Sequence, residues 1–142
     1  MLDYGRGIWP RHSKWNWGMA SGKQGDDIIG LNFGGQWTDN TGSTENAVIL
    51  NGIITKIGED VEFIYDSNDY MKPWRIESKI TDQVSLTFHP YFERTAISNA
   101  LIVKSNVHQM VGHYDGKIKL ANGNVLHVDG LHGCIEDHKA KW

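Results

Sequence analysis

Residues 74–89, Trp-Arg-Ile-Glu-Ser-Lys-Ile-Thr-Asp-Gln-Val-Ser-Leu-Thr-Phe-His, decide the fold class. Every second residue is apolar or small from Trp74 to Ile80, and again from Val84 to Phe88, while the residues between them are polar or charged. A period of two is that of a β-strand with one buried face. Thr81-Asp82-Gln83 separates the two runs and predicts a hairpin turn. The stretch therefore predicts two antiparallel strands with a common buried face.

The same pattern continues outward in both directions, and Gly and Asn mark the turns. Asn-Gly pairs favour tight hairpins because both residues tolerate positive φ. Three further hairpins are predicted on this basis: Trp15–Ala20 with Ile28–Phe33 around Gly22–Gly25, Ala47–Leu50 with Ile53–Ile57 around Asn51-Gly52, and Lys117–Leu120 with Val125–Val128 around Asn122-Gly123.

Two segments complete the expected strands. Val61 to Tyr65 predicts a short strand, and Ser98 to Tyr114 predicts one long strand with Asp115-Gly116 as its exit turn. Any helix should be short, near Asn68–Lys72 or at the C-terminus. Roughly nine or ten short-looped strands predict an all-β, antiparallel, lipocalin-like (calycin-type) barrel with little helix. Residues 1–12 should lead into a single barrel domain, residues 13–142.

Composition excludes several classes of protein. The 142 residues are 22% charged with a formal net charge of −3, which argues against a nucleic-acid groove because such a groove needs a basic stripe. No run approaches the roughly 18 apolar residues of a membrane span. Cys134 is the single cysteine, so no internal disulfide can form, and a reduced, cytoplasmic setting is expected.

Trp15 and Trp17 form the most unusual local feature. On a strand the two indoles point to the same face, where they could line an apolar cavity and offer their N–H groups to a ligand. The alternative is a plain pair of core residues, and the pattern does not choose between the two.

Glu45 follows a glycine-rich turn and shares a strand face with Ala47 and Ile49. If that face points inward, Glu45 is a buried carboxylate able to act as an acid or a base; otherwise it is a rim residue. His138 could pair with a neighbouring carboxylate only with tertiary help. The seven histidines match no specific metal spacing, so we expect no metal site and no cofactor.

Several segments resemble a family of proteins known as domain of unknown function 2804. The segments that carry the resemblance are Leu2–Gly7, Trp9–Arg11, Lys14–Trp17, Thr44–Asn46, Met71–Ile76, Val107–Gly112, Val128–Leu131 and Ile135–Trp142. They span essentially the whole chain. Family members are about twice this long, so the resemblance implies that the chain is a C-terminal half whose partner is an N-terminal half.

A more distant similarity is to the carotenoid hydratase and AttH-like superfamily, which resembles two lipocalin-like barrels in tandem. Its Asp-His-Asn-Trp-Gly strand would correspond to Leu2–Gly7, with Asp3 at the aspartate and Tyr4 where the histidine would be. Tyrosine is a poorer acid–base group at neutral pH because its unperturbed pKa lies near 10. This departure puts a hydratase-type proton transfer in doubt.

Three functions stay open. The first is a module that binds a small apolar or amphipathic molecule, and the second is an acid–base enzyme of hydratase, isomerase or cyclase type acting on a lipid-like substrate. The third is a non-catalytic half that packs on the N-terminal half or forms a homodimer. The candidate catalytic residues are Asp3, Tyr4, Glu45 and His138, and the candidate ligand-binding residues are Arg11, Trp15, Trp17, Asn46, Arg94, His108 and Gln109.

Overall fold

The computed structural model describes residue 8, residues 10–100 and residues 103–142. Within these residues the chain forms strands and no helix, which confirms the all-β prediction. Residues 68–72 form turns, and the C-terminus is a strand, so neither predicted short helix is present there. The strands are β1 (His12–Gln24), β2 (Asp27–Gly35), β3 (Ala47–Leu50), β4 (Ile53–Lys56), β5 (Val61–Ile64), β6 (Trp74–Ser78), β7 (Val84–Ala100), β8 (Val103–Lys119) and β9 (Val125–Lys141).

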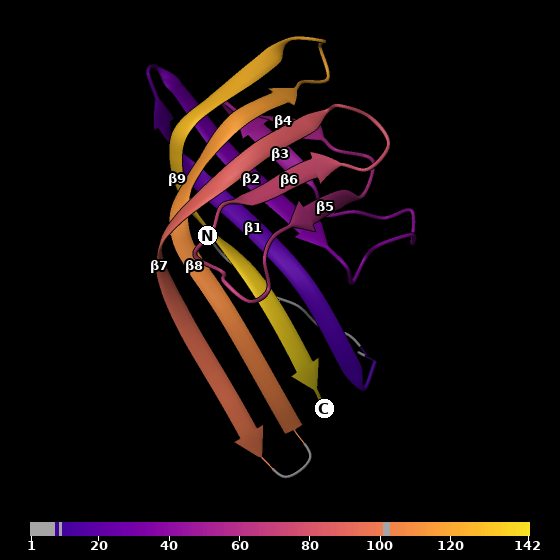
Figure 1. Cartoon of the computed structure of the whole chain (residues 1–142). Coiled ribbons are helices and arrows are strands. Elements are labelled where there is room, and N and C mark those ends of the chain that lie inside the picture. The colour runs from indigo at the N-terminus through magenta and orange to yellow at the C-terminus, as the bar shows by residue number, and fades with distance from the viewer. Residues whose placement is uncertain (1–7, 9, 101–102) are drawn as a thin grey trace.

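All the described strands belong to one antiparallel sheet in the order β4-β3-β2-β1-β9-β8-β7-β6-β5. The N-terminal strand thus pairs with the C-terminal strand in the middle of the sheet. The sheet curls so that β5 lies over β2, and it forms a half-barrel consistent with a lipocalin-like barrel (Figure 1). The edge strands β4 and β5 each pair with one described neighbour and not with each other, so the barrel is not closed by hydrogen bonds between them.

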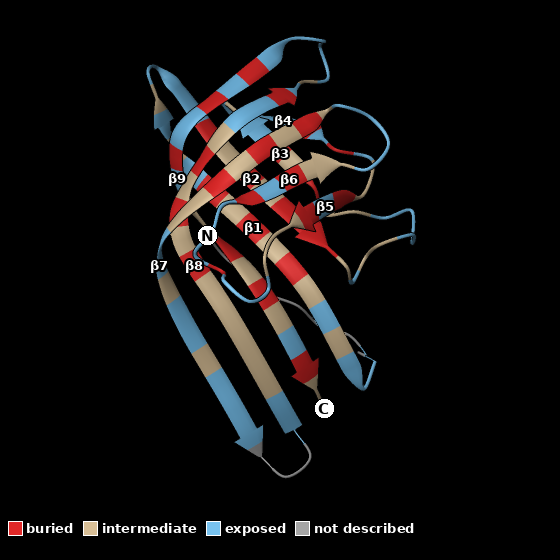
Figure 2. Ribbon diagram, viewed as in Figure 1, coloured by how far each residue is buried: buried red, intermediate tan, exposed pale blue. Residues whose placement is uncertain are grey.

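The concave, inner face of the sheet holds the core. Four residues are buried there, as the alternation in residues 74–89 predicts: Trp74, Ile76, Leu86 and Phe88. Figure 2 shows the buried positions concentrated in the curled body, where along most strands they alternate with intermediate or exposed ones. The prediction that Ile80 belongs to the buried face is wrong, since β6 ends at Ser78 and Ile80 is 84% exposed.

The Asn51-Gly52 turn is confirmed. Asn51 and Gly52 have φ values of 51° and 82°, the left-handed conformation that this hairpin needs. The side chain of Asn51 also accepts a hydrogen bond from the Ile28 backbone N–H at 2.8 Å, which ties the hairpin to β2.

The prediction of one long strand from Ser98 to Tyr114 is wrong. The chain reverses between Ala100 and Val103, which are cross-strand partners, and two strands of 17 residues lie side by side. No Gly, Pro or Asn-Gly pair marks this reversal in the sequence. Asp115-Gly116 is not an exit turn either, because it lies inside β8 at a bulge against β9.

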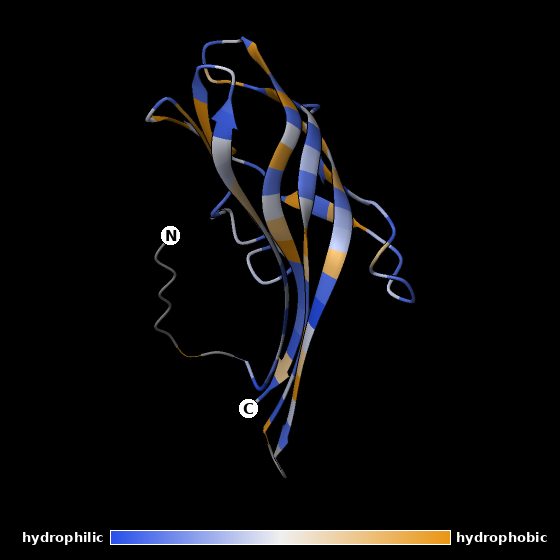
Figure 3. Cartoon of the chain, turned by 90° about the vertical axis from the view of Figure 1, so that its left-hand side faces the viewer, coloured by the Kyte–Doolittle hydropathy of each residue, from blue (hydrophilic) through white to orange (hydrophobic). Residues whose placement is uncertain are grey.

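The four longest strands, β1, β7, β8 and β9, continue beyond the curled body as an extension (Figure 3). Polar and apolar residues are mixed along it, and both its faces are partly open to solvent. No helix long and apolar enough to cross a bilayer occurs among the described residues.

Candidate functional site

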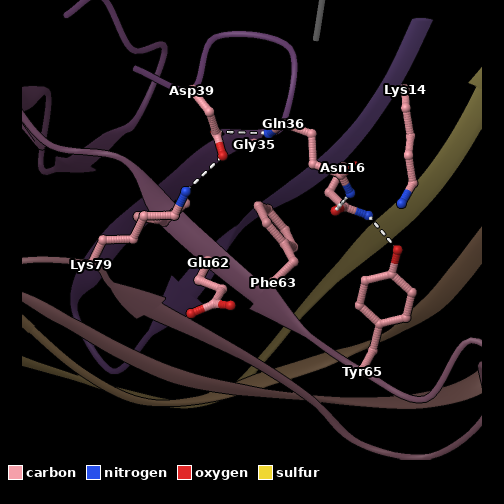
Figure 4. Close-up of a pocket in the computed structure, with 10 residues that line it drawn as sticks. Lys14, Asn16, Gly35, Gln36, Asp39, Glu62, Phe63, Tyr65 and Lys79 are labelled. Carbon is pink, nitrogen blue, oxygen red and sulfur yellow. Dashed lines mark hydrogen bonds and ion pairs between the residues drawn. The ribbon is translucent and has the colours of Figure 1, made fainter.

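A cleft of about 270 Å³ opens where β1 and the end of β2 meet β5. Phe63 and Val61 form its apolar wall, and the remaining side chains are polar or charged (Figure 4). Gly35 packs closely on this wall, since a Cβ at this position would lie only 3.0 Å from the Phe63 ring. The residues that line the cleft are Lys14, Asn16, Gly35, Gln36, Asp39, Val61, Glu62, Phe63, Tyr65 and Lys79.

Asn16 is the buried polar group of the cleft, with 1% of its surface exposed. Trp15 and Trp17 share the outer face of β1, so Asn16 between them takes the inner face. Its amide donates to the Tyr65 hydroxyl at 3.3 Å and to the Glu136 carbonyl at 3.2 Å, and its carbonyl accepts from the Gln36 side chain. Asn16 therefore fixes the polar groups of Tyr65 and Gln36 at the cleft.

The rim of the cleft carries charge. Lys79 pairs with Asp39 at 2.6 Å, and this hydrogen bond raises the pKa of the lysine. Asp39 also accepts from the Gln36 backbone N–H at 2.8 Å. The Lys14 side chain extends toward Asn16 and Tyr65 (Figure 4), and it forms no ion pair with another residue in the described ranges. Lys14 is thus the cation of this rim that remains available to a ligand.

A second buried polar group, Asp137, lies beside Asn16 as its direct partner on β9, with 1% of its surface exposed. One carboxylate oxygen accepts from the Tyr70 hydroxyl at 2.7 Å and lies 3.2 Å from the Lys139 ammonium. The other oxygen is buried without a hydrogen-bond partner among the described residues. A buried, half-satisfied carboxylate costs stability, so it is unusual in a purely structural position.

The aromatic groups around Asp137 link it to a histidine–glutamate pair. The Tyr70 ring stacks on the His108 ring with centroids 4.2 Å apart, and His108 Nδ1 lies 2.6 Å from Glu93 Oε1. Burial, followed by the hydrogen bond to Asp137, raises the pKa of Tyr70 well above its usual value. Tyr70 is therefore a hydrogen-bond donor that stays neutral. We refer to Asn16, Tyr65, Tyr70, Glu93, His108 and Asp137 as the inner polar cluster.

Trp15 and Trp17 share a face of β1 as predicted, but that face is the outer one. The Trp15 ring packs on His138 with centroids 3.9 Å apart, and Trp17 donates its Nε1–H to Asn32 at 3.0 Å. The inner face of this strand carries Lys14, Asn16, Gly18 and Ala20. The two indoles therefore do not line the cleft.

His138 acquires a carboxylate partner on the same outer face. Its Nδ1 lies 3.3 Å from Glu136 Oε1 and its Nε2 lies 2.9 Å from Ser105 Oγ. Ser105 belongs to β8, which pairs with β7 on one side and with β9 on the other. The backbone N–H groups of β8 are therefore engaged in the two ladders and do not point at a ligand. Gln109 also contacts Glu136 at 3.3 Å, and the exposed Arg94 lies opposite Gln109 on β7.

Glu45 and Asn46 both contact Gly34 of β2. The Glu45 carboxylate covers Gly34, where a Cβ would collide with it, and accepts from the Trp37 indole at 3.1 Å. Its strand face points outward, because Ile49 on the same face is 42% exposed. Asn46 is fully buried and joins the Gly34 N–H to the Glu59 carbonyl through bonds of 2.8 and 3.1 Å.

The remaining predicted residues are placed as follows. His108 belongs to the inner polar cluster, Arg11 is exposed at the start of β1, and Asp3 and Tyr4 lie outside the described residues. The sequence did not identify the other five members of the inner polar cluster as site residues, nor Lys14 and Lys79 of the cleft. One signal was present, since Asn16 is four residues from Ala20 and Asp137 is two residues from Ile135, so each shares a strand face with a buried apolar residue.

A family model described as "Domain of unknown function (DUF2804)" matches residues 1–142. No curated protein and no solved structure matches the chain. The more distant similarity to carotenoid hydratases therefore stays a prediction.

Proposed function

Since this chain belongs to the DUF2804 family, a domain of unknown function, its own geometry must guide the assignment, and we propose that the cleft binds a small amphipathic molecule. The observation that carries the proposal is the buried Asn16, which holds Tyr65 and Gln36 at an opening walled by Phe63. Such a site, with an apolar wall and a few fixed polar groups, is typical of small-molecule pockets.

Among the described residues, large apolar side chains occupy the centre of the half-barrel, where an apolar ligand would otherwise lie. Phe33, Trp74, Phe88 and Tyr114 are fully buried there and fill the interior. The cleft volume of about 270 Å³ lies just below the range of roughly 300–1,000 Å³ that is usual for ligand pockets. It suits a compact molecule or the head of a longer one, whose tail would lie along Phe63 and out of the cleft.

Lys14 selects the head group. A carboxylate or similar anion placed near its ammonium would also lie near the Tyr65 hydroxyl, which the Asn16 amide holds in place (Figure 4). Charge-assisted hydrogen bonds of this kind are stronger than neutral ones. We therefore favour an amphipathic ligand with an anionic head over a purely apolar one.

The test is titration of the purified full chain with cis-parinaric acid, a fluorescent fatty acid, and with its methyl ester. We expect Lys14→Ala and Tyr65→Phe to weaken binding of the acid several-fold and to affect the ester little. Lys23→Ala, which changes an exposed lysine on the same strand, is the matched control. Binding that survives both cleft variants but is lost in Trp15→Ala would place the ligand on the outer face and overturn the proposal.

An acid–base enzyme is the second candidate, and the half-satisfied carboxylate of Asp137 favours it. Asp137 and His108 are direct cross-strand partners on β9 and β8, so the two side chains lie on the same face of the sheet. Asp137 does not line the cleft itself, so this candidate requires a ligand that reaches past Asn16 to the carboxylate, which would take a proton from it and return it. Deuterium incorporation from D₂O into a bound unsaturated fatty acid, read by mass spectrometry, should occur with the native chain and stop in Asp137→Asn. Absence of exchange in both would remove this candidate.

Association with an N-terminal half or a second copy remains a prediction that light scattering can check.

A further inference from the structure

A separate cluster of titratable side chains lies on the outer face of the sheet, away from the cleft. His89 on β7 and His113 on β8 are direct cross-strand partners, and their rings stack with centroids 5.0 Å apart. Cross-strand partners point to the same face, so both imidazoles project outward where Phe88 and Tyr114 project into the core. Neither histidine belongs to the site described above.

Asp115 completes the cluster from the same strand as His113. Its Oδ2 lies 3.3 Å from His113 Nε2 and 3.5 Å from His89 Nε2. Its Oδ1 accepts a hydrogen bond from the Gly130 backbone N–H at 2.7 Å. The β8–β9 bulge after Tyr114 brings Gly130 to this position. One carboxylate oxygen is thus anchored by the backbone while the other faces two imidazoles.

We propose that His89, His113 and Asp115 bind a first-row divalent transition-metal ion, with Zn²⁺ as the representative probe. One donor atom from each side chain lies within 4.8 Å of the other two. Ligands bound to Zn²⁺ at about 2.0–2.1 Å in a tetrahedral arrangement lie roughly 3.3–3.5 Å apart. The two imidazole-to-carboxylate distances already match this spacing. The stacked imidazole rings would have to tilt toward each other so that both nitrogens face the ion.

The chemistry of the donors also fits such an ion. Two imidazoles with one carboxylate suit zinc and similar transition metals better than Mg²⁺ or Ca²⁺, which prefer oxygen ligands alone. The bond from Gly130 orients the carboxylate in the way that outer hydrogen bonds orient metal ligands. The side chains of His89, His113 and Asp115 are 41%, 37% and 36% exposed, so water can occupy the remaining coordination positions.

Binding here would join β7 to β8 at a weak point of their pairing. The β7–β8 register shifts between Pro90 and Phe92, immediately after His89. From this point both strands leave the curled body and form the extension (Figure 1). A metal ion bonded to both strands would therefore stabilise the sheet where its ladder is interrupted.

The test uses the purified full chain after removal of metals with a chelator. Isothermal titration with ZnCl₂ should show one site, and Co²⁺ should develop the visible absorption of a four-coordinate ion. We expect His89→Ala, His113→Ala and Asp115→Asn each to weaken Zn²⁺ binding at least tenfold. Asp115→Asn is the gentlest change, because the amide oxygen can still accept from Gly130.

His127→Ala is the matched control, since His127 is an exposed histidine on β9 outside the cluster. Binding in this variant should be unchanged. The native melting temperature should rise on adding Zn²⁺ and should not rise in His113→Ala, because a ligand that binds only the folded state stabilises it. Absence of a site in the native chain, or binding that persists in His89→Ala/His113→Ala with unaltered circular dichroism, would overturn the proposal.

Discussion

Asn16 and Asp137 lie directly opposite each other on β1 and β9, and each is buried to 1% exposure on the inner face of the sheet. They come from opposite ends of the chain. Asn16 uses both its amide hydrogens and its carbonyl, whereas Asp137 keeps one oxygen without a partner in the described structure. This pair connects the cleft to the charged members of the inner polar cluster, and the consequences can be measured.

The Tyr70–Asp137 hydrogen bond should be worth more than an exposed one, because one partner is charged and both are buried. We expect Tyr70→Phe to lower the free energy of unfolding by about 1.5–3 kcal/mol in urea denaturation. A double-mutant cycle with Asp137→Asn should give a coupling energy of at least about 0.5 kcal/mol. Strict additivity of the two changes would show that the charge of Asp137 adds nothing to the bond, because an asparagine oxygen can still accept from Tyr70. Asp129→Asn, an exposed position on β9, is the control.

Stability should fall at alkaline pH because of the buried tyrosines. Burial raises the pKa of Tyr65, Tyr70 and Tyr114, so in the folded chain these phenols stay protonated while in the unfolded chain they ionise near pH 10. Their stabilising contribution is full below pH 10 and is lost as the pH rises above it. Each group adds up to about 1.4 kcal/mol per pH unit to the slope. Urea denaturation from pH 9 upward measures that slope.

The matched variant for this effect is Tyr114→Phe, which removes one of the three phenols. Its hydroxyl donates to the Cys134 carbonyl at 2.7 Å, so the variant should be less stable at neutral pH and should also show a shallower alkaline slope. An unchanged slope would mean that Tyr114 ionises in the folded chain as freely as in the unfolded one.

Gly112 should tolerate no side chain. A Cβ there would lie 2.2 Å from the His89 carbonyl oxygen and 2.6 Å from the Phe88 ring. We expect Gly112→Ala to destabilise the fold by about 1–3 kcal/mol or more, which a thermal melt followed by circular dichroism will show. Gly58→Ala is the control, because a Cβ at Gly58 meets nothing within 4 Å. Equal melting temperatures for the two variants would contradict the close packing of β7 on β8.

Cys134 should react slowly. Burial raises the pKa of its thiol and the nearby Glu136 charge adds to the shift, so little of the reactive thiolate is present at neutral pH. Modification by Ellman's reagent should be much slower in the native chain than in urea, and Glu136→Gln should accelerate the native reaction. A native rate equal to the denatured rate would contradict this placement of the thiol.

The sequence predicted the cleft less well than the fold. The period of two identified β6 and the start of β7, and the Asn51-Gly52 pair identified the β3–β4 hairpin. These signals are local, since neighbouring residues alone carry them. No such local signal marks the reversal between β7 and β8. The reversal is fixed by the pairing of the two strands over their whole length.

By itself the sequence determined the strand class, most of the hairpins and the family, because alternation, turn residues and spaced motifs are properties of short segments. Only the tertiary structure decided which face of each strand became the interior. It turned Trp15 and Trp17 outward and Asn16 and Asp137 inward, and it brought His89 and His113 together with Asp115 on the outer surface. The physical reason is that a strand offers two equivalent faces, and the choice between them depends on burial against strands far away in the chain.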